Sequence, residues 1–314
     1  MTKVALLFPG QGSQYVGMGK DLYEKYKPAR QVFDKANAVL NKNITSMCFE
    51  GPEEELKQTI NTQPAMVTMS IAALEALKAE LNITPKYTAG HSLGEYCAMY
   101  ASGVMSLEDT LKAIQKRAEL MNTVKGGSMA AVIKASDEQL KAGLEEGRKF
   151  GYVDIANYNS PSQVVITGDT EAVKATSDYL LANGVKRVVP LAVSGAFHSK
   201  YVKEAGEKFK EFLKTLPLND AKVPVITNVD AEITTQAEDF RAKMPKQIYS
   251  SVHWTQTIKK MVEEGVNTFI EIGPGCVLAN LNRKIAPDSN IYNVYDTESL
   301  ENTIAELKGQ TANV

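Results

Sequence analysis

The chain has 314 residues, of which 44% are hydrophobic and 23% charged, a composition typical of a globular domain rather than of a disordered or fibrous chain. Its formal net charge of −2 argues against nucleic acid as a partner, because proteins that bind polyanions are usually basic. The three cysteines, Cys48, Cys97 and Cys276, are too far apart to suggest a disulfide framework or a zinc site, and no apolar run is long enough for a signal peptide or a membrane span, so we expect a cytoplasmic protein.

The first part of the chain alternates apolar strands with helices. Residues 3–8, KVALLF, form a continuous apolar run that ends at Pro9 and Gly10, which predicts a buried strand of a parallel sheet. Hydrophobic spacing and end signals predict further elements in chain order: a helix at 63–81, a strand at 86–92, a helix at 93–103 and an amphipathic helix at 106–124.

The pattern changes after Gly126 and Gly127. Strand-like and helix-like segments then follow in the order β-α-β-β-α-β, ending with VKRVVPLA at 185–192. This order is typical of a ferredoxin-like unit. We therefore predict a small inserted ferredoxin-like α+β domain at 127–195.

The remaining chain returns to the larger unit. A helix at about 200–216, a strand at 223–230, a helix at 254–265 and a strand at 268–275 are expected, and residues 310–314 read as a C-terminal tail. The predicted fold is thus α/β, with a large discontinuous α/β-hydrolase-like catalytic domain over 1–126 and 196–309 and a mainly parallel sheet.

A Gly-x-Ser-x-Gly motif lies between the second expected strand and its helix, with Ser92 between Gly90 and Gly94. A strand–motif–helix passage of this kind is a nucleophile elbow, in which the amide of the next residue, Leu93, can donate to an oxyanion. The alternative is that Ser92 only caps the helix that follows.

A serine nucleophile needs a base, and the chain has three histidines. His91 is adjacent to Ser92, where side chains diverge, and His253 begins an expected helix beside the only tryptophan. His198 lies in the loop that returns the chain to the large domain, and it is the favoured base. Asp154 and Asp169 lie between Ser92 and His198 in sequence, but both fall in the small domain, so neither suits a catalytic triad.

Three segments carry a family resemblance: FPGQGSQ at 8–14, GHSLGEY at 90–96 and GAFHS at 195–199. Together with Arg117 they are similar to the malonyl-CoA:acyl carrier protein transacylases of bacterial fatty-acid synthesis and to the acyltransferase domains of polyketide synthases. The resemblance extends over essentially the whole chain, to about Leu307.

The resemblance implies roles for individual residues. Ser92 would be acylated, His198 would be its base, and Gln11 and the Leu93 amide would form the oxyanion hole. Arg117 would hold the malonyl carboxylate. The expected pH–rate profile has a limb at about pH 6 to 7, where an unperturbed histidine titrates.

The resemblance also accounts for the missing acidic partner of the histidine. In this family a backbone carbonyl orients the histidine, and the matching residue is Gln247. Phe197 resembles the form of the motif found in members that use malonyl rather than methylmalonyl groups. Cys97 stands where many members have a small residue such as alanine, which should affect packing behind the elbow.

The implied reaction is a ping-pong transfer of malonyl from malonyl-CoA to the phosphopantetheine thiol of acyl carrier protein. It needs no metal and no resident cofactor, and we expect a monomer that binds neither nucleic acid nor membrane. Two alternatives remain from the sequence: a serine hydrolase or thioesterase that passes the acyl group to water, and a non-catalytic module that binds a carrier protein.

Overall fold

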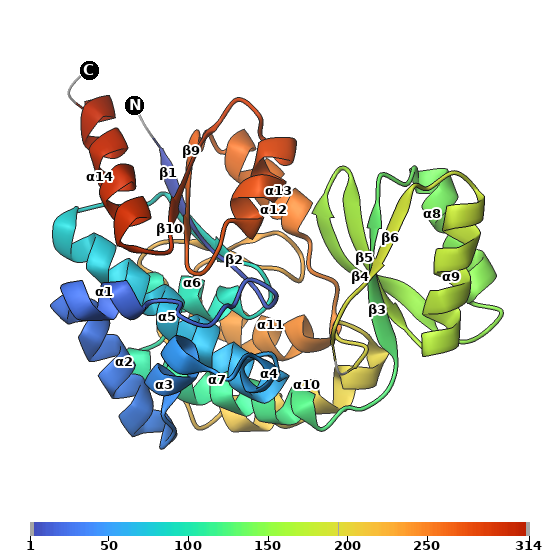
Figure 1. Ribbon diagram of the computed structural model, residues 1–314, viewed down its shortest axis with the longest axis horizontal. Helices are drawn as coiled ribbons and strands as arrows, with labels where there is room; N and C mark the ends of the chain where they lie inside the picture. Colours follow the sequence, from blue (N-terminus) through green and yellow to red (C-terminus); the bar gives the residue numbers. More distant parts are fainter. Residues whose placement is uncertain (1–2, 194, 312–314) are drawn as a thin grey trace.

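The computed structural model describes residues 3–193 and 195–311. It is a mixed α/β structure with a mainly parallel six-stranded sheet and an antiparallel four-stranded sheet, which lie in two bodies side by side (Figure 1). The strands are β1 (Val4–Phe8), β2 (Tyr87–Gly90), β3 (Ser128–Ile133), β4 (Val153–Ser160), β5 (Gln163–Gly168), β6 (Arg187–Pro190), β7 (Val225–Ile226), β8 (Ile233–Thr234), β9 (Thr268–Ile272) and β10 (Asn290–Val294).

Helices surround both sheets. They are α1 (Lys20–Lys25), α2 (Lys27–Leu40), α3 (Ile44–Glu50), α4 (Glu53–Leu56), α5 (Thr59–Glu80), α6 (Gly94–Ala101), α7 (Leu107–Asn122), α8 (Asp137–Gly147), α9 (Thr170–Ala182), the short 3-10 helix η1 (Lys200–Val202), α10 (Lys203–Leu213), α11 (Ala237–Tyr249), α12 (Trp254–Glu263), α13 (Val277–Ile285) and α14 (Thr297–Thr311).

The six-stranded sheet has the order β10-β9-β1-β2-β7-β8. All neighbours pair in parallel except β7 and β8, which form an antiparallel pair at the edge. The central strand β1 lies between β9 and β2, with Phe8 opposite Gly90. The carboxyl ends of β1 and β2 therefore meet at one edge of the sheet, where ligands of open α/β sheets bind.

Side chains of β1 alternate between two separate cores, as the period of a strand requires. Leu6 and Phe8 join the larger core, to which α2, α5, α7 and α10 contribute, whereas Ala5 and Leu7 join a smaller core with α12 and α13. Both faces of the sheet are thus covered, which explains why the sequence of β1 is a continuous apolar run rather than an alternating one.

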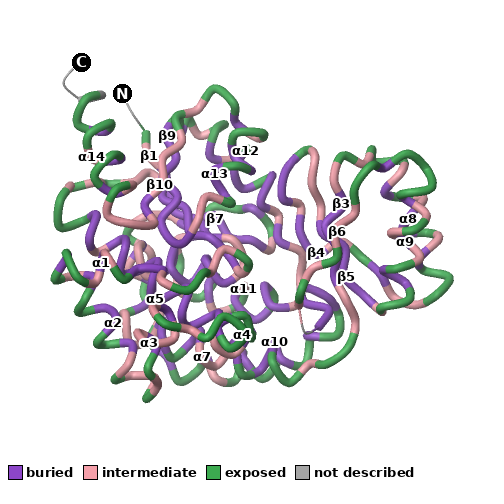
Figure 2. The backbone as a smooth tube through the Cα atoms, in the orientation of Figure 1, coloured by how far each residue is buried: buried purple, intermediate pink, exposed green. Residues whose placement is uncertain are grey.

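Helix α5 is the central helix of the large body. Its residues 62–74 are buried without interruption, and the backbone at the α5 label in Figure 2 is drawn largely in purple, the colour of buried residues. Because the helix is covered on all sides, its hydrophobicity has no preferred face. Its polar residues in this stretch, Gln63 among them, are therefore enclosed by protein.

The smaller sheet has the order β4-β5-β3-β6, and every neighbouring pair is antiparallel. Helices α8 and α9 pack on it through a third core that includes Val132, Ile166 and Leu180. The outward surfaces of these helices are exposed, as Figure 2 shows. The chain enters this body through Gly126 and leaves it through Gly195, which form an isolated parallel bridge.

Most elements expected from hydrophobic pattern are present, with shifted ends. The expected strand at 223–230 shortens to β7, because the chain turns at Thr227–Glu232 and forms the pair with β8. Helices α1 to α4, α11, α13 and α14 and strand β10 occupy segments for which no element was expected. Helix α14 continues to Thr311, two residues into the expected tail, and residues 312–314 lie outside the described residues.

Over the described part of the chain, no helix is both long and apolar enough to cross a membrane.

Two glycines allow β2 and α6 to meet β1 closely. A Cβ atom on Gly94 would lie 2.2 Å from the carbonyl oxygen of Phe8, and one on Gly90 would lie 1.9 Å from the carbonyl carbon of Gly94. Both contacts are with backbone atoms, which cannot rotate away. Helix α6 can therefore begin against the end of β1 only if these positions lack side chains.

We predict that Gly94→Ala destabilises the protein by more than about 3 kcal/mol, or prevents folding, because backbone must move to admit the methyl group. Gly184→Ala is the matched control: Gly184 has a left-handed φ of 92°, and an added Cβ would meet no atom closer than 3.6 Å. The control should lose only about 1–2 kcal/mol. Thermal and urea unfolding measure both, and equal losses would show that the contact with Phe8 is not a constraint.

Candidate active site

Ser92 lies on a strained turn between β2 and α6. Its φ of 52° is in the left-handed region, where few residues other than glycine lie unless surrounding structure holds them. Three hydrogen bonds fix the turn: the Ser92 N–H donates to Asn228 Oδ1 at 2.7 Å, Asn228 Nδ2 donates to the Gly90 carbonyl at 2.7 Å, and Gln247 Nε2 donates to the Ser92 carbonyl at 2.7 Å. The side chain of Ser92 is thereby directed into a cavity.

Asn228 is itself held in place through its backbone. Its backbone N–H donates to Glu95 Oε2 at 2.6 Å, and both residues are buried. Burial raises the pKa of Glu95 to about 8, against the opposing effects of the Asn228 N–H and the charge of Arg117. The pair links α6 to the loop after β7, so the elbow is anchored from both sides.

His198 faces Ser92 from the loop after β6. Its Nε2 lies 2.8 Å from Ser92 Oγ, and its Nδ1 lies 3.0 Å from the carbonyl oxygens of both Gln247 and Ser250. Because carbonyls only accept hydrogen bonds, Nδ1 carries the proton and Nε2 is left to accept from the serine hydroxyl. Like Ser92, His198 has a left-handed φ, here 53°.

Burial lowers the pKa of His198 to about 3, with further lowering by the charge of Arg117 and by His91. The imidazole is therefore neutral, and able to accept a proton, throughout the neutral range. We therefore expect the acid limb of the free protein to lie well below pH 6 to 7, the range expected for an unperturbed histidine. The shift in this pKa is not predictable from the sequence, because it depends on the enclosure of the ring.

Arg117 is buried at the base of the same site, with 1% of its surface exposed. Its Nη1 donates to Gln63 Oε1 at 2.7 Å, and its Nη2 donates to Ser92 Oγ at 3.0 Å and to Gln247 Oε1 at 3.2 Å. The guanidinium lies over the Tyr96 ring at 5.7 Å, a cation–π contact. No carboxylate lies within ion-pair distance of Arg117 in residues 3–193 and 195–311, and its Nε has no partner there.

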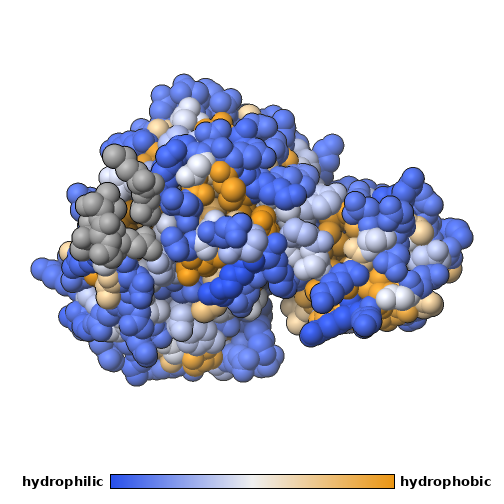
Figure 3. All heavy atoms as spheres, turned by 90° about the horizontal axis from the view of Figure 1, so that it is seen from above, coloured by the Kyte–Doolittle hydropathy of each residue, from blue (hydrophilic) through white to orange (hydrophobic). Residues whose placement is uncertain are grey.

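A cavity of about 440 Å³ joins these groups. Ser92, Arg117 and His198 line it, with Met121, Met129 and Phe197 among its apolar walls. Viewed from above, hydrophobic residues gather on the large body beside the notch between the two bodies (Figure 3). A polar reacting centre in a half-open cavity whose surface is mostly apolar suits acyl chemistry, in which contact with water must be limited.

Gln11 and Leu93 also line the cavity, from the loop after β1 and from the elbow. The backbone N–H groups of both residues lack an acceptor among the hydrogen bonds of the described chain. The Gln11 side chain has one weak contact, at 3.5 Å from Nε2 to Thr59 Oγ1. Two free amides beside a nucleophile can stabilise an oxyanion.

Two other histidines do not contact Ser92 through hydrogen bonds. His91 lines the cavity, but its Nε2 bonds to Asn159 Oδ1 at 2.8 Å and its ring lies beside Trp254. His253 stacks on the Tyr158 ring at 5.1 Å. The structure therefore brings together Ser92, His198, Arg117, Gln247, Gln11, Leu93 and Phe197.

Four residues that support the site were not among those predicted from the sequence: Gln63, Asn228, Glu95 and Ser250. Only Gln63 carried a usable signal, as a polar residue in an apolar helix, since a buried amide needs a partner. Cys97, where packing behind the elbow was expected to differ, is fully buried in the large core.

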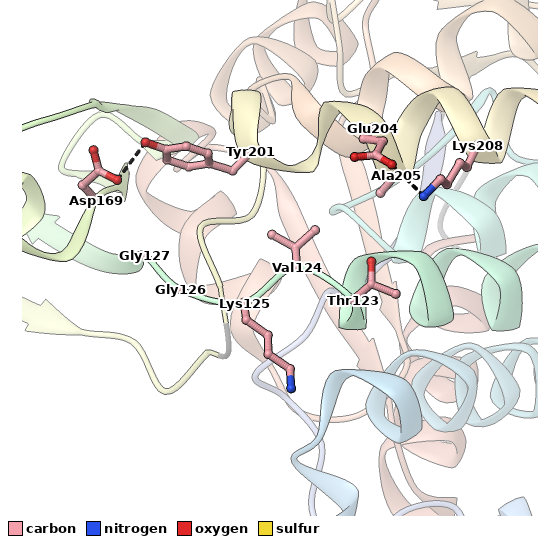
Figure 4. A pocket seen from close by; sticks show the side chains of 10 residues that line it. All are labelled: Thr123, Val124, Lys125, Gly126, Gly127, Asp169, Tyr201, Glu204, Ala205 and Lys208. Atoms are coloured by element: carbon pink, nitrogen blue, oxygen red, sulfur yellow. Dashed lines mark hydrogen bonds and ion pairs between the residues drawn. The ribbon is translucent and has the colours of Figure 1, made fainter.

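A second cavity, of about 450 Å³, lies where the two bodies join. Its lining includes Lys125, Asp169 and Tyr201, and Figure 4 shows the Tyr201 hydroxyl bonded to Asp169 across it, at 2.7 Å. None of the residues around Ser92 lines this cavity.

The described part of the chain holds no cluster of three or more histidine, cysteine or acidic side chains suited to a metal ion.

Comparison with known proteins places this geometry in a family. A model of the acyl transferase domain matches residues 5–299. Malonyl CoA-acyl carrier protein transacylase of Bacillus subtilis (strain 168) is 45% identical over 317 residues, covering 100% of both chains. The transacylase of the same name from Staphylococcus aureus (strain MRSA252) is 40% identical, covering 96% of this chain and 98% of the relative.

Solved structures agree with the sequence relatives. The malonyl CoA-acyl carrier protein transacylase of Clostridium perfringens superimposes with a TM-score of 0.94 at 35% identity, covering 99% of both chains. A malonyl-transacylase solved with its type II polyketide acyl carrier protein gives a TM-score of 0.92 at 36% identity, covering 95% of this chain and 98% of that one. This chain therefore belongs to the acyl transferase family, among the malonyl CoA-acyl carrier protein transacylases.

Proposed function

We propose that this protein transfers a malonyl group from malonyl-CoA to the phosphopantetheine thiol of acyl carrier protein, through an ester on Ser92. The observation that carries the proposal is a serine hydroxyl held between a base and a buried cation: Ser92 Oγ lies 2.8 Å from His198 Nε2 and 3.0 Å from Arg117 Nη2. Serine and histidine supply acyl-transfer chemistry, and the arginine offers a partner for the free carboxylate that distinguishes a malonyl group.

In the first half-reaction, His198 Nε2 takes the hydroxyl proton as Ser92 Oγ attacks the thioester carbon. The carbonyls of Gln247 and Ser250 hold the Nδ1–H and stabilise the imidazolium that forms. The amides of Leu93 and Gln11 donate to the oxyanion. The C–S bond then breaks, the coenzyme A thiolate takes the proton from His198, and the malonyl ester remains on Ser92.

The second half-reaction reverses these steps with a different thiol. His198 removes the proton from the phosphopantetheine S–H, and the sulfur attacks the ester carbon. The Ser92 oxygen leaves and recovers its proton from His198, while the carrier departs with the malonyl thioester. Apolar walls around the ester disfavour water as the acceptor. The reaction needs no metal and no resident cofactor, because both thiols are carried by the substrates.

We further propose that the protein acts as a monomer in the cytoplasm. Two of its cysteines, Cys48 and Cys97, are buried as free thiols, which suits a reducing compartment. We also propose that the large body has an α/β-hydrolase-like fold and that the small body has a ferredoxin-like fold. The antiparallel order β4-β5-β3-β6 with two helices supports the ferredoxin-like fold, and it supports residues 127–195 as an inserted domain.

The test of the proposal is intact-protein mass spectrometry after mixing with malonyl-CoA alone, followed by addition of acyl carrier protein. The protein should gain one malonyl group as one equivalent of coenzyme A is released. The malonyl group should then move to the carrier. Continuous release of coenzyme A without a carrier would make the protein a hydrolase. A protein that binds the carrier but never gains a malonyl group would be a non-catalytic module.

Ser92→Ala should abolish the malonyl adduct and leave the fold intact, because it removes one oxygen that faces a cavity. The matched control is Ser162→Ala, in the turn between β4 and β5, where among the described residues the hydroxyl hydrogen-bonds only to Ser160 Oγ. It should acquire malonyl as the native protein does. Retention of the adduct by Ser92→Ala would assign the nucleophile elsewhere.

The free protein should keep its serine reactivity far into the acid range. Because the pKa of His198 is lowered to about 3, the base is neutral above that pH, and protonation removes it only as the pH falls through that value. The rate at which a neutral sulfonyl fluoride labels Ser92 should therefore stay nearly constant from about pH 8 to pH 5. A midpoint near the ordinary histidine pKa of about 6.5 would contradict this enclosure of the ring.

Arg117→Ala should lower kcat/KM for malonyl-CoA by about 100-fold or more, because two charge-assisted hydrogen bonds to a desolvated carboxylate are lost. Transfer from acetyl-CoA, which lacks that carboxylate, should not fall. Lys116→Ala removes a half-buried charge, paired with Glu119 at 3.9 Å, from the preceding position of α7 and should change neither rate. Equal losses for both donors in Arg117→Ala would make the arginine structural or a contact of the coenzyme A carrier.

A further inference from the structure

The hydrogen bonds of Arg117 constrain the nucleophile in the free protein. Ser92 Oγ donates its proton to His198 Nε2 and accepts a hydrogen bond from Arg117 Nη2, at 3.0 Å. The second bond ties an oxygen lone pair to a cation, and a lone pair so engaged is less available for attack. The same cation opposes protonation of His198, because an imidazolium would then form beside a guanidinium.

The substrate carboxylate must compete for the same nitrogen. A planar carboxylate contacts a guanidinium at two points either through Nη1 and Nη2 or through Nη2 and Nε, so Nη2 takes part in both arrangements. Both hydrogens of Nη2 are already committed, one to Ser92 Oγ and one to Gln247 Oε1. Two-point binding therefore requires one of these two acceptors to leave.

Ser92 is the acceptor that can leave. It lines the cavity from which a substrate arrives, whereas Gln247 does not line the cavity and is held by a second bond, from its Nε2 to the Ser92 carbonyl. Gln63 holds Nη1 at 2.7 Å, so the guanidinium stays in place during the exchange. The Nε of Arg117 is buried without a partner in the described chain, and a carboxylate could supply one.

We propose that Arg117 restrains the Ser92–His198 pair in the free protein, and that the carboxylate of the acyl donor releases it by taking the place of Ser92 Oγ on Nη2. The proposal rests on the proposed function and deepens it: the malonyl carboxylate is an activator of the nucleophile as well as a handle for binding. Donors without a carboxylate, such as acetyl thioesters, meet a serine that is still restrained.

The test supplies the carboxylate separately from the electrophile. Phenylmethanesulfonyl fluoride is neutral; Ser92 Oγ bonds to its sulfur, fluoride leaves, and the hydroxyl proton passes to His198. Labelling of the native protein is followed by mass spectrometry with increasing sodium formate. Formamide, which has a similar shape and no charge, and sodium chloride at equal ionic strength are the controls. Formate should raise the labelling rate about tenfold, the effect of a hydrogen bond from a charged group.

Two variants sharpen the test. Arg117→Gln should be labelled faster than the native protein and should not respond to formate. Lys116→Gln, which loses a charge from the same helix at a position that does not line the cavity, should respond as the native protein does. Formate that slows native labelling or leaves it unchanged would overturn the proposal, as would an equal response in Arg117→Gln. Circular dichroism will show whether Arg117→Gln folds. If it does not, the proposal is tested by comparing the effects of formate and formamide on the labelling rate of the native protein.

The same preparations are tested with malonyl-CoA, so that two kinds of failure remain distinct. Native protein that gains no malonyl group contradicts the proposed function, whatever formate does. If native protein gains a malonyl group but formate does not accelerate labelling, the proposed function stands. Only the proposal that a carboxylate releases Ser92 is then contradicted.

Discussion

A buried cation without an anionic partner governs this site. Removing a guanidinium from water costs several kcal/mol unless other groups compensate. Arg117 is compensated by the amide oxygens of Gln63 and Gln247, the hydroxyl of Ser92 and the Tyr96 ring, none of which carries a negative charge. The site is thus arranged around a positive charge that no described carboxylate neutralises at close range, which supports the proposed role of Arg117 in binding the malonyl carboxylate.

The elbow and the arginine are not independent features, because one side chain joins them. Gln247 donates from Nε2 to the Ser92 carbonyl, accepts at Oε1 from Arg117, and accepts at its backbone oxygen from His198. Asn228 completes the support by accepting the Ser92 N–H. Both come from loops or helices beyond β6, far from the elbow in sequence, so the reactive geometry forms only when the large body is complete.

Local pattern was sufficient to predict the central strands and helices and to single out Ser92 as a candidate, because apolar periodicity and a glycine-flanked serine are signals within short windows, whereas the role expected of Arg117 came only from the family resemblance. The support of the site was not predictable in this way. Asn228 and Glu95 make a bond across 133 positions of sequence, and nothing in the residues around Asn228 indicates what its amide faces. The lowered pKa of His198 was not predictable for the same reason, since enclosure is a property of the folded whole.

The orientation of His198 by carbonyl oxygens has an evolutionary consequence. A carboxylate in that position could be lost through a single base change, whereas the backbone oxygens of Gln247 and Ser250 persist whatever side chains those positions encode. In the proposed mechanism the partner that orients His198 is therefore shielded from side-chain substitution, and it changes only when the backbone of the segment from α11 to α12 moves. The cost is that natural selection cannot tune the basicity of this histidine by exchanging its partner, and must act through the cation beside it.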